Sequence, residues 1–322
     1  LLPENKDPEA ALSVVMEMAM QLAAKKQAAK IVDFRHAHDV LVADYVSKWN
    51  APEAAGLMLG WPTLDGMTGG LTVGDLASFV GLTGAGKTFM LLYSAMHGWL
   101  QAGKSTETDQ SRLFVSMEMG VLPIQHRMAA MLTHLPLTQV KQATLASANL
   151  KKLKDGLMEI QGFGAPFWVV DGNLTSTVED IWALCRQLKP AACFVDGGYL
   201  VKHPTEKDRF RRVAENADLM KMELAALCPT VVSWQFAKSA AKKKKGEKVG
   251  LEDIGYSHAI PEVSSLVAAL FQEDSVQTLL RRKVDIIKGR NGEVGAFDIN
   301  WHFDKMDFTE VADQDLSELS FL

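Results

Sequence analysis

The residues with the clearest chemical potential form a glycine-rich loop that follows the pattern GxxxxGK[ST] in full. In such a loop the glycines let backbone N–H groups close around phosphate, and the following helix adds the positive end of its dipole. The lysine neutralises β- and γ-phosphate oxygens, and the threonine hydroxyl binds magnesium. We therefore predict a Mg²⁺–ATP site formed by Gly81, Gly84, Ala85, Gly86, Lys87 and Thr88, with Thr88 also a metal ligand.

The sequence around this loop favours the phosphate-binding interpretation over a chance glycine turn. The strand-like run DLASFV precedes the loop, and the helix-like run FMLLYSAMHGWL follows it. Strand, loop and helix in this order are the structural context that the motif requires.

Two carboxylates further along the chain could complete the chemistry. Asp196 ends the apolar strand-like run ACFVD, which suits a residue that holds the magnesium shell, although strand-terminal aspartates are also common for other reasons. Glu118 follows the strand-like run in RLFVSMEM and could activate a water for hydrolysis. From spacing alone, Glu118 could equally be the first residue of a helix.

The elements that must position these residues alternate between strands and helices. Apolar runs in DLASFVG, RLFVSMEM, PFWVVD, ACFVDG and PTVVSWQ alternate with longer helical segments, which predicts an α/β domain with a mainly parallel sheet. The later runs RKVDIIKG, GAFDINWHF and MDFTEV predict antiparallel strands at the sheet edge. Helices are expected at 11–31 and at about His36 to Trp49.

These elements suggest three regions: a helical linker or docking segment at 1–50, an ATPase domain at 51–312, and an acidic tail at 313–322. The chain starts at Leu1 rather than Met, which is compatible with processing or with a longer protein that carries an upstream domain, and the sequence leaves these alternatives open.

Composition limits the classes of partner. The formal net charge of −5 argues against electrostatic binding of nucleic acid over the whole protein surface, so any DNA contact is expected to be local. The cysteines, Cys185, Cys193 and Cys228, lack metal-ligand spacing and have apolar neighbours, which favours buried, reduced thiols over a disulfide framework. No apolar stretch is long enough to span a bilayer. We expect a cytoplasmic protein without a membrane partner, in a bacterial or phage-infected bacterial cell.

Several motifs in succession resemble the motor domain of DnaB-like replicative DNA helicases. The run GWPTLDGMTGGLTVGDLASFVGLTGAGKT resembles the start of that domain, and SMEM is especially similar to phage-encoded members. ACFVDGGYL, PTVVSWQFAKS and VDIIKGRNGEVGAFDINW resemble its later strands in the same order. The resemblance covers about residues 57–310 and implies a RecA-like P-loop ATPase core preceded by a helical linker.

The resemblance implies a role for each matching residue. Glu118 would be the general base, Asp196 the magnesium-shell acid and Gln235 the γ-phosphate sensor. Lys288 and Arg290 would act on the ATP site of an adjacent subunit, which implies a homo-oligomer, in this family a hexameric ring. Without the resemblance, Lys288 and Arg290 would be assigned to a solvated turn before Asn291-Gly292, a strong hairpin signal.

Contacts to single-stranded DNA are expected between residues 237 and 271. Lysines in this region, Lys238 and the run Lys242, Lys243, Lys244 and Lys245, could follow the phosphate backbone without regard to base sequence. They could equally form a solvated surface loop. The segment Asp253 to Ile260 resembles the family's DNA loop, but Gly255, Tyr256 and His258 replace arginine, glutamate and glycine there, which puts DNA contacts at these positions in doubt.

A second departure from the family pattern follows the magnesium-shell acid. Asp196-Gly197-Gly198-Tyr199 has paired glycines where the family has bulkier residues, which predicts an unusually mobile loop.

These features together predict a magnesium- and ATP-dependent replicative helicase that encircles single-stranded DNA, moves along it and displaces the complementary strand. A primase and a helicase loader are expected partners, and the helix at about 9–31 is expected to dock on an adjacent subunit. Two alternatives remain: a RecA-type strand-exchange recombinase, and an ATP-dependent assembly switch or loader without unwinding. The KGRNG sequence on a late strand favours the helicase.

Overall fold

The computed structural model describes residues 33–50, 56–103, 110–172, 177–236, 254, 258–271 and 279–311. The chain divides into two compact units, Leu1–Pro52 and Glu53–Leu322. In the first unit, a short 3₁₀ turn, η1 (Phe34–His36), precedes the helix α2 (His38–Asn50). The helix expected at His36 to Trp49 is therefore confirmed with a slightly later start, whereas the helix expected at 11–31 lies outside the described residues.

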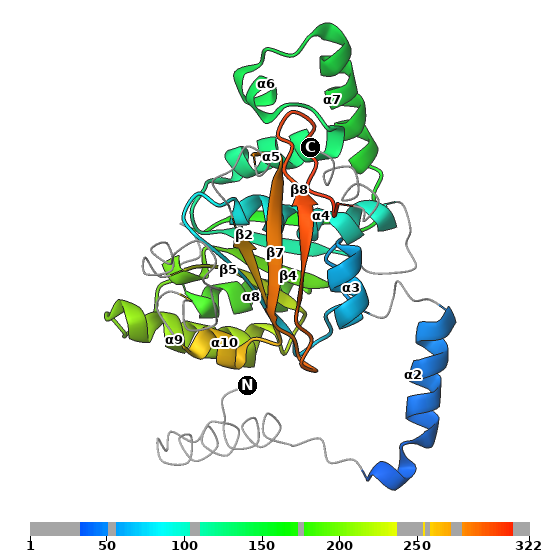
Figure 1. Ribbon diagram of the computed structural model, residues 1–322, viewed down its shortest axis with the longest axis vertical. Coiled ribbons are helices and arrows are strands. Elements are labelled where there is room, and N and C mark those ends of the chain that lie inside the picture. Colours follow the sequence, from blue (N-terminus) through cyan, green and yellow to red (C-terminus); the bar gives the residue numbers. More distant parts are fainter. Residues whose placement is uncertain are drawn as a thin grey trace, which may run out of the picture. The chain divides into compact units, whose positions relative to one another are not determined.

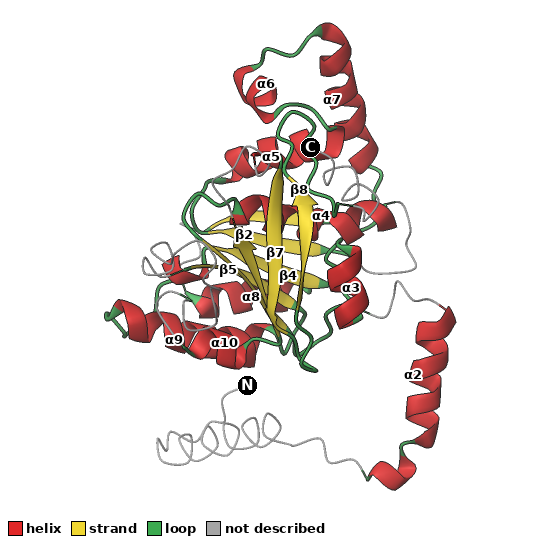
Figure 2. Cartoon of the chain, viewed as in Figure 1, coloured by secondary structure: helices red, strands yellow, loops and turns green. Residues whose placement is uncertain are grey.

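The described part of the second unit contains an eight-stranded sheet in the order β3-β2-β4-β5-β1-β6-β7-β8 (Figure 2). The strands from β3 to β6 in this order run parallel to one another. Strand β7 pairs antiparallel with β6, and β8 pairs antiparallel with β7. This arrangement confirms the predicted α/β class with antiparallel edge strands. The strands are β1 (Leu76–Gly81), β2 (Arg112–Ser116), β3 (Phe167–Asp171), β4 (Ala192–Asp196), β5 (Thr230–Gln235), β6 (Leu266–Phe271), β7 (Arg281–Lys288) and β8 (Gly295–Asn300).

Helices cover both faces of the sheet, as expected when parallel strands are apolar on both sides (Figure 1). Along β1, Ala77 and Phe79 join one buried apolar cluster, while Leu76 and Val80 join another on the opposite face. The helices of this unit are α3 (Pro62–Thr68), α4 (Lys87–Ala102), α5 (Val121–Thr133), α6 (Leu137–Gln142), α7 (Ser147–Ile160), α8 (Val178–Leu188), the 3₁₀ turn η3 (Gly198–Leu200), α9 (Arg209–Leu219), the π-helical turn η4 (Met220–Leu224) and α10 (Ala259–Val263). None of the described helices is long and apolar enough to cross a membrane.

Two sequence interpretations of the strands were wrong. The run LVAALF at 266–271 was included in the DNA-loop region, but it forms β6, a strand between β1 and β7. Its leucines and alanines carry no alternating pattern because both faces of this strand are buried. The run MDFTEV at 306–311 forms no named strand and contributes only isolated bridges, Ile299↔Glu310 and His302↔Asp307.

The three cysteines gather in space although they are distant in sequence. Cys185, Cys193 and Cys228 are buried in one apolar cluster and form no disulfide. Hydrogen bonding between the thiols, together with burial, raises the pKa of Cys185 and of Cys228. These groups are therefore protonated, unreactive thiols, in agreement with the sequence interpretation.

Candidate nucleotide site

The glycine-rich loop leaves the carboxyl end of β1 and enters α4 at Lys87. Gly84 and Gly86 have φ values of 79° and 103°, in the left-handed region that glycine adopts readily. A Cβ atom on Gly86 would also lie 2.2 Å from Cζ2 of Trp301. Glycine at position 86 is thus required both by the backbone and by the indole packed against the loop.

Lys87 is held inside this loop. Its Nζ donates hydrogen bonds to the carbonyl oxygens of Gly81, at 3.1 Å, and Leu82, at 2.9 Å. Burial lowers the pKa of Lys87, while the charges of Glu118 and Asp196 oppose that shift. The arrangement places a partly desolvated ammonium where phosphate oxygens could replace the two carbonyl partners.

Asp196 lies beside the loop because β4 ends there, two strands away from β1 in the sheet. Its Oδ2 accepts a hydrogen bond from Oγ1 of Thr88 at 2.8 Å, and its Oδ1 accepts one from Oγ of Ser233 at 2.8 Å. Burial raises the pKa of Asp196, although these two hydrogen bonds and the charges of Arg127 and Lys87 oppose the rise. The predicted magnesium ligands Thr88 and Asp196 are thus brought together.

Glu118 follows β2, whose last residue, Ser116, is in register with Asp196. Oγ of Ser116 accepts a hydrogen bond from the backbone N–H of Met119 at 3.1 Å, which fixes the turn that carries Glu118. Burial and the charge of Asp196 raise the pKa of Glu118, while Lys87 and Arg127 oppose the rise. A half-buried carboxylate with a raised pKa beside a phosphate loop has the properties of a general base.

Gln235 ends β5, which pairs with β1 so that Gln235 lies opposite Gly81, the first residue of the loop. Its Nε2 donates a hydrogen bond to the hydroxyl of Tyr199 at 2.7 Å. The structure therefore gathers four predicted polar groups at the carboxyl end of the parallel strands: Lys87, Glu118, Asp196 and Gln235.

Arg127, on α5, is a charged neighbour of the site to which the sequence analysis gave no role. Its guanidinium carbon lies 4.6 Å above the ring centroid of Phe89, the residue after Thr88. Burial lowers the pKa of Arg127, whereas the charges of Asp196 and Glu118 oppose that change. Arg127 thus partly balances the two carboxylates. The sequence alone gave no sign that Arg127 stacks on Phe89.

Ser233 and Tyr199 are two further residues that the sequence analysis missed. Besides its bond to Asp196, Ser233 Oγ accepts a hydrogen bond from the backbone N–H of Gly197 at 2.8 Å. The Tyr199 hydroxyl donates a hydrogen bond to Oε1 of Glu118. Both residues belong to strand motifs already recognised, but the pairing of β4 with β5 was needed to place them.

The paired glycines after Asp196 form a packed turn, so the expectation of an unusually mobile loop was wrong. Gly197 and Gly198 are buried, and a Cβ on Gly198 would lie 2.5 Å from Cγ1 of Val232 and 2.8 Å from the Trp234 ring. Gly198 therefore lets η3 pack directly on β5.

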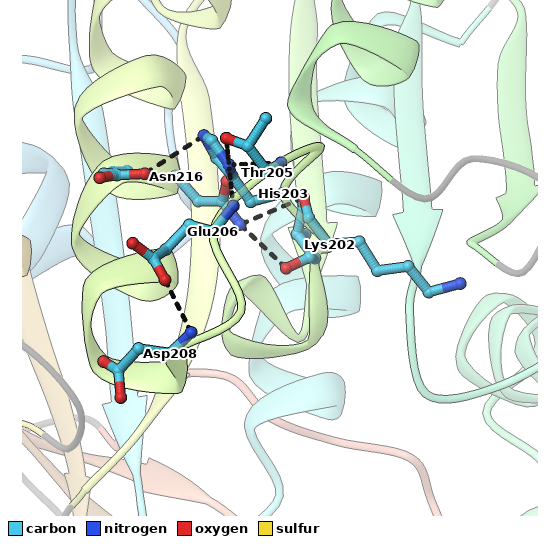
Figure 3. A network of polar contacts seen from close by, with 8 residues as sticks. Lys202, His203, Thr205, Glu206, Asp208 and Asn216 are labelled. Carbon is cyan, nitrogen blue, oxygen red and sulfur yellow. Dashed lines mark hydrogen bonds and ion pairs between the residues drawn. The ribbon is translucent and has the colours of Figure 1, made fainter.

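The chain after η3 is fixed to α9 by a network of polar contacts (Figure 3). Nδ1 of His203 accepts a hydrogen bond from the backbone N–H of Glu206 at 3.0 Å, and its Nε2 lies 3.3 Å from a carboxylate oxygen of Glu215. The buried side chain of Asn216 donates to the carbonyl oxygen of Val201 at 2.9 Å. Both sides of η3 are consequently held in place.

Lys288 and Arg290 lie at the other end of the sheet. Because β7 runs antiparallel to β6, its last residue, Lys288, is in register with Val267 near the start of β6. The Lys288 ammonium donates hydrogen bonds to the carbonyl oxygens of Pro261 and Glu262. The structure thus does not bring Lys288 and Arg290 to the phosphate loop of their own chain.

Arg290 forms an ion pair with Asp75, the residue before β1. Its Nη1 lies 2.8 Å from Oδ1 of Asp75, whose side chain is 7% exposed, while Arg290 itself is 57% exposed. Lys221 donates hydrogen bonds nearby, to the carbonyl oxygen of Gly74 at 2.7 Å and to Oγ of Ser265 at 3.1 Å. This amino end of the sheet is therefore rich in cations.

Most of the predicted DNA-contacting residues lie outside the described part of the chain, namely Lys238, Lys242, Lys243, Lys244, Lys245, Gly255 and Tyr256. His258, another predicted DNA-contacting residue, belongs to the described residues. It is exposed and occupies the N-cap position of α10. Ile254, in the predicted DNA loop, is also described, and it forms an antiparallel bridge with Phe236, the residue after Gln235. Ile254 thus lies beside the residue that follows Gln235.

The sequence family described as the DnaB-like helicase C terminal domain matches residues 56–310, most of the chain. This chain belongs to the DnaB-like helicase family. The match confirms the resemblance drawn from the motifs, and its bounds are close to the expected 57–310.

Known members of the DnaB-like helicase family are similar to this chain over much of its length. It is 25% identical over 298 residues to "Replicative DNA helicase DnaC" of Bacillus subtilis (strain 168), covering 88% of this chain and 63% of that protein. It is 23% identical over 276 residues to "Replicative DNA helicase DnaB" of Geobacillus stearothermophilus, covering 81% of this chain and 59% of that protein. The chain therefore spans about three fifths of the length of these two DnaB-like relatives.

Solved structures support the DnaB-like fold. An ATPase domain superposes with a TM-score of 0.73 at 19% identity, covering 86% of this chain and 99% of that one. A structure described as a DnaB-like replicative helicase and its interactions with primase superposes with a TM-score of 0.71 at 19% identity, covering 92% of this chain and 72% of that one. The RecA-like core expected from the sequence is thereby confirmed.

Proposed function

We propose that this protein is the motor of a replicative DNA helicase: a homo-oligomeric ring, of six subunits, that hydrolyses ATP, translocates on single-stranded DNA and unwinds duplex DNA. Membership of the DnaB-like helicase family supports the general activity. The polar groups around the phosphate loop support ATP hydrolysis.

The observation that carries the proposal is the separation of the two halves of the catalytic site within one chain. The phosphate loop follows the carboxyl end of β1, whereas Arg290 contacts Asp75 just before the amino end of the same strand. Six residues of β-strand span roughly 20 Å, several times the reach of a hydrogen bond. Arg290 can therefore complete an ATP site only in another copy of the chain.

The chemistry of the proposed site follows from its charges. Glu118 would take a proton from the attacking water, and its raised pKa suits that task. Lys87 and the N-terminus of α4 would bind the phosphates, and Gln235 would contact the γ-phosphate. Arg290 of an adjacent copy, supported by Lys288, would stabilise the charge that develops during phosphoryl transfer.

Thr88 and Asp196 are the residues that would hold magnesium. The Thr88 hydroxyl and the Asp196 carboxylate converge at 2.8 Å, and Asp196 also accepts a hydrogen bond from the Ser233 hydroxyl. Its buried negative charge suits a divalent ion. Within the described residues, no cluster of three or more His, Cys, Asp or Glu side chains could hold a metal alone. This agrees with a magnesium ion that completes its shell with phosphate oxygens and water. When bound, it would neutralise phosphate charge.

The proposed ring also needs contacts between copies. Helix α2 has no buried residue, and its large apolar side chains include Val40, 71% exposed, and Trp49, 73% exposed. A helix of 13 residues is marginal by itself in water, so it requires a packing partner. We propose that this helix docks on an adjacent copy, as part of the linker expected at 1–50.

The remaining roles are assigned from the sequence and the family. Single-stranded DNA would be contacted by Lys242, Lys243, Lys244 and Lys245 and by the segment containing Gly255, Tyr256 and His258. A primase and a helicase loader are proposed as protein partners, and the bacterial or phage-infected cytoplasm as the location.

A mixing experiment tests the divided site. ATP hydrolysis is measured with and without single-stranded DNA for the wild type, Lys87→Ala and Arg290→Ala, across protein concentrations and in mixtures of the two variants. Each variant alone should lose roughly 10³-fold or more of the DNA-stimulated rate. In the mixture, an Arg290→Ala subunit keeps an intact phosphate loop and can receive Arg290 from a Lys87→Ala neighbour, so part of the activity should return.

Arg186→Ala is the matched control, because Arg186 is an exposed arginine in the last turn of α8, which precedes β4, whereas Asp196 lies at the far end of β4. It should hydrolyse ATP like the wild type. Activity that survives Arg290→Ala and ignores DNA would contradict the motor and favour the assembly switch. DNA-stimulated hydrolysis without strand displacement in an unwinding assay would instead favour the recombinase.

A further inference from the structure

The tyrosine that follows the paired glycines lies between two residues of the proposed ATPase site. Tyr199 belongs to η3, is 3% exposed, and enters the site because Gly198 lets that turn pack against β5. The family pattern assigns no role to a tyrosine here, since Asp196-Gly197-Gly198-Tyr199 departs from it.

Two hydrogen bonds involve the hydroxyl of Tyr199. Nε2 of Gln235 donates to the Tyr199 oxygen at 2.7 Å, and the Tyr199 hydroxyl donates to Oε1 of Glu118. The directions of the two bonds are consistent, because a phenol oxygen can accept from an amide while its proton is donated to a carboxylate. A donor aimed at a carboxylate makes a charge-assisted hydrogen bond, which is stronger than a neutral one and restricts where the carboxylate points.

We propose that Tyr199 is a positioning residue that couples the γ-phosphate sensor Gln235 to the general base Glu118. The inference rests on the proposed function, because it assumes those two roles. Tyr199 would act through Glu118, holding one carboxylate oxygen so that the other faces the attacking water.

The same chain of contacts reaches the proposed DNA-binding region. Gln235 is the last residue of β5, and the next residue, Phe236, bridges to Ile254 in the predicted DNA loop. A change in that loop would therefore move the backbone next to Gln235, and through Tyr199 it would alter the position of Glu118. This connection gives a physical route by which DNA could raise the rate of hydrolysis.

The surroundings of Tyr199 are rigid enough for such coupling. Gly197 before it is bonded to Ser233, and Val201 after it is bonded to Asn216, so the turn is held on both sides. Displacement of the Gln235 amide would thus act on the Tyr199 hydroxyl, and through that hydroxyl on Glu118, while the backbone of the turn stays in place.

The test removes the hydroxyl and keeps the ring. Tyr199→Phe is compared with Tyr93→Phe, a matched control in which the lost hydroxyl donates to the carbonyl oxygen of Gly60, outside the ATPase site. For Tyr199→Phe, kcat of DNA-stimulated ATP hydrolysis should fall about tenfold, the loss expected for one hydrogen bond to a charged group. KM for ATP should stay within about twofold, and the ratio of rates with and without DNA should fall toward one. Tyr93→Phe should behave like the wild type.

A double-mutant cycle with Gln235→Leu tests the coupling itself. If Gln235 acts on Glu118 through Tyr199, the double variant should be little slower than the slower single variant. Independent, multiplicative losses would overturn the proposal. So would a wild-type kcat and DNA response for Tyr199→Phe, or a faster rate without DNA, which would mean that Tyr199 restrains the base.

Two further measurements distinguish a failure of the inference about Tyr199 from a failure of the proposed function. Tyr199→Phe should match the wild type in its binding of a fluorescent ATP analogue and in its far-ultraviolet circular dichroism. If a loss of nucleotide binding accounts for the lost rate, the role of Tyr199 is purely structural and the inference is overturned. Glu118→Gln is assayed in parallel. If Glu118→Gln abolishes hydrolysis while Tyr199→Phe changes nothing, only the inference about Tyr199 fails; if Glu118→Gln hydrolyses ATP normally, the proposed site itself fails.

Discussion

The two ends of the parallel sheet carry different sets of charged side chains. At the carboxyl end, Asp196 is buried and Glu118 is partly exposed near the phosphate loop, and desolvation raises the pKa of both. At the amino end, Arg290 pairs with Asp75, Lys221 and Lys288 lie nearby, and burial lowers the pKa of the two lysines. Each end therefore holds charges that are costly to bury in isolation.

The difference indicates how the ends could work together. The carboxyl end holds Lys87 and Arg127 beside its two carboxylates, whereas the amino end has an arginine that is more than half exposed. If two copies met with the amino end of one against the carboxyl end of the other, as the proposed ring requires, Arg290 of one copy would lie near the carboxylates of the next. Such a head-to-tail interface generates a ring when its rotation closes.

The largest effect is expected from replacing the proposed general base at the carboxyl end. Glu118→Gln keeps the size of the side chain but cannot accept a proton, so the hydrolysis rate should fall by roughly 10²- to 10⁴-fold. Binding of a fluorescent ATP analogue should be retained, because Lys87 and the loop are unchanged. Steady-state ATPase assays measure the effect, with Glu179→Gln on the exposed start of α8 as the control. A Glu118→Gln rate within a few-fold of the wild type would show that the carboxyl end does not supply the base.

A smaller effect is expected from neutralising the carboxylate at the amino end. Burial raises the pKa of Asp75, but hydrogen bonds from Thr72 and Ser265 and the charge of Arg290 outweigh it, so the pKa lies below its ordinary value. Asp75→Asn should lower the free energy of unfolding by about 1–2 kcal/mol near neutral pH, since Arg290 is partly screened by solvent. Urea denaturation measures this change.

The pH dependence of that loss follows from the direction of the pKa shift. A lowered pKa in the folded state means that the carboxylate stabilises the fold above its ordinary pKa, about 4, and that this contribution disappears as the pH falls through the folded pKa. The difference between wild type and Asp75→Asn should therefore shrink below about pH 4. Asp285→Asn, which loses a more exposed pair with Lys283 at 3.2 Å, should cost less than about 1 kcal/mol. An equal loss for both variants would count against a special role for Asp75.

Effects on stability of a similar size are expected from glycine packing. Gly198→Ala would place a Cβ against Val232 and Trp234, which are buried, and should lower the free energy of unfolding by about 1–3 kcal/mol. Gly66→Ala, within α3, meets no atom within 4 Å and should stabilise the protein by about 0.5–1 kcal/mol. Thermal unfolding of both variants measures these changes. If Gly198→Ala were as stable as the wild type, the turn that carries Tyr199 would be less tightly packed than the geometry indicates.

Much of the fold could be predicted because apolar runs, glycines and prolines act locally. The strands from β1 to β5 and the pair β7 and β8 were predicted from their apolar runs. Strand β6 was missed because LVAALF combines good helix formers with burial on both faces, so neither composition nor alternation marks it as a strand. MDFTEV was assigned as a strand because its pattern suits an extended segment, yet it forms only isolated bridges.

The sequence by itself determined the phosphate loop, because all of its chemistry lies within eight consecutive residues between a strand and a helix. The order of the later motifs determined the family in the same way. The tertiary structure alone decided which distant side chains meet: Thr88 with Asp196, Tyr199 with Glu118 and Gln235, and Arg290 with Asp75. These contacts depend on the order and register of strands that are far apart in sequence, and the spacing within a single motif carries no information about that order.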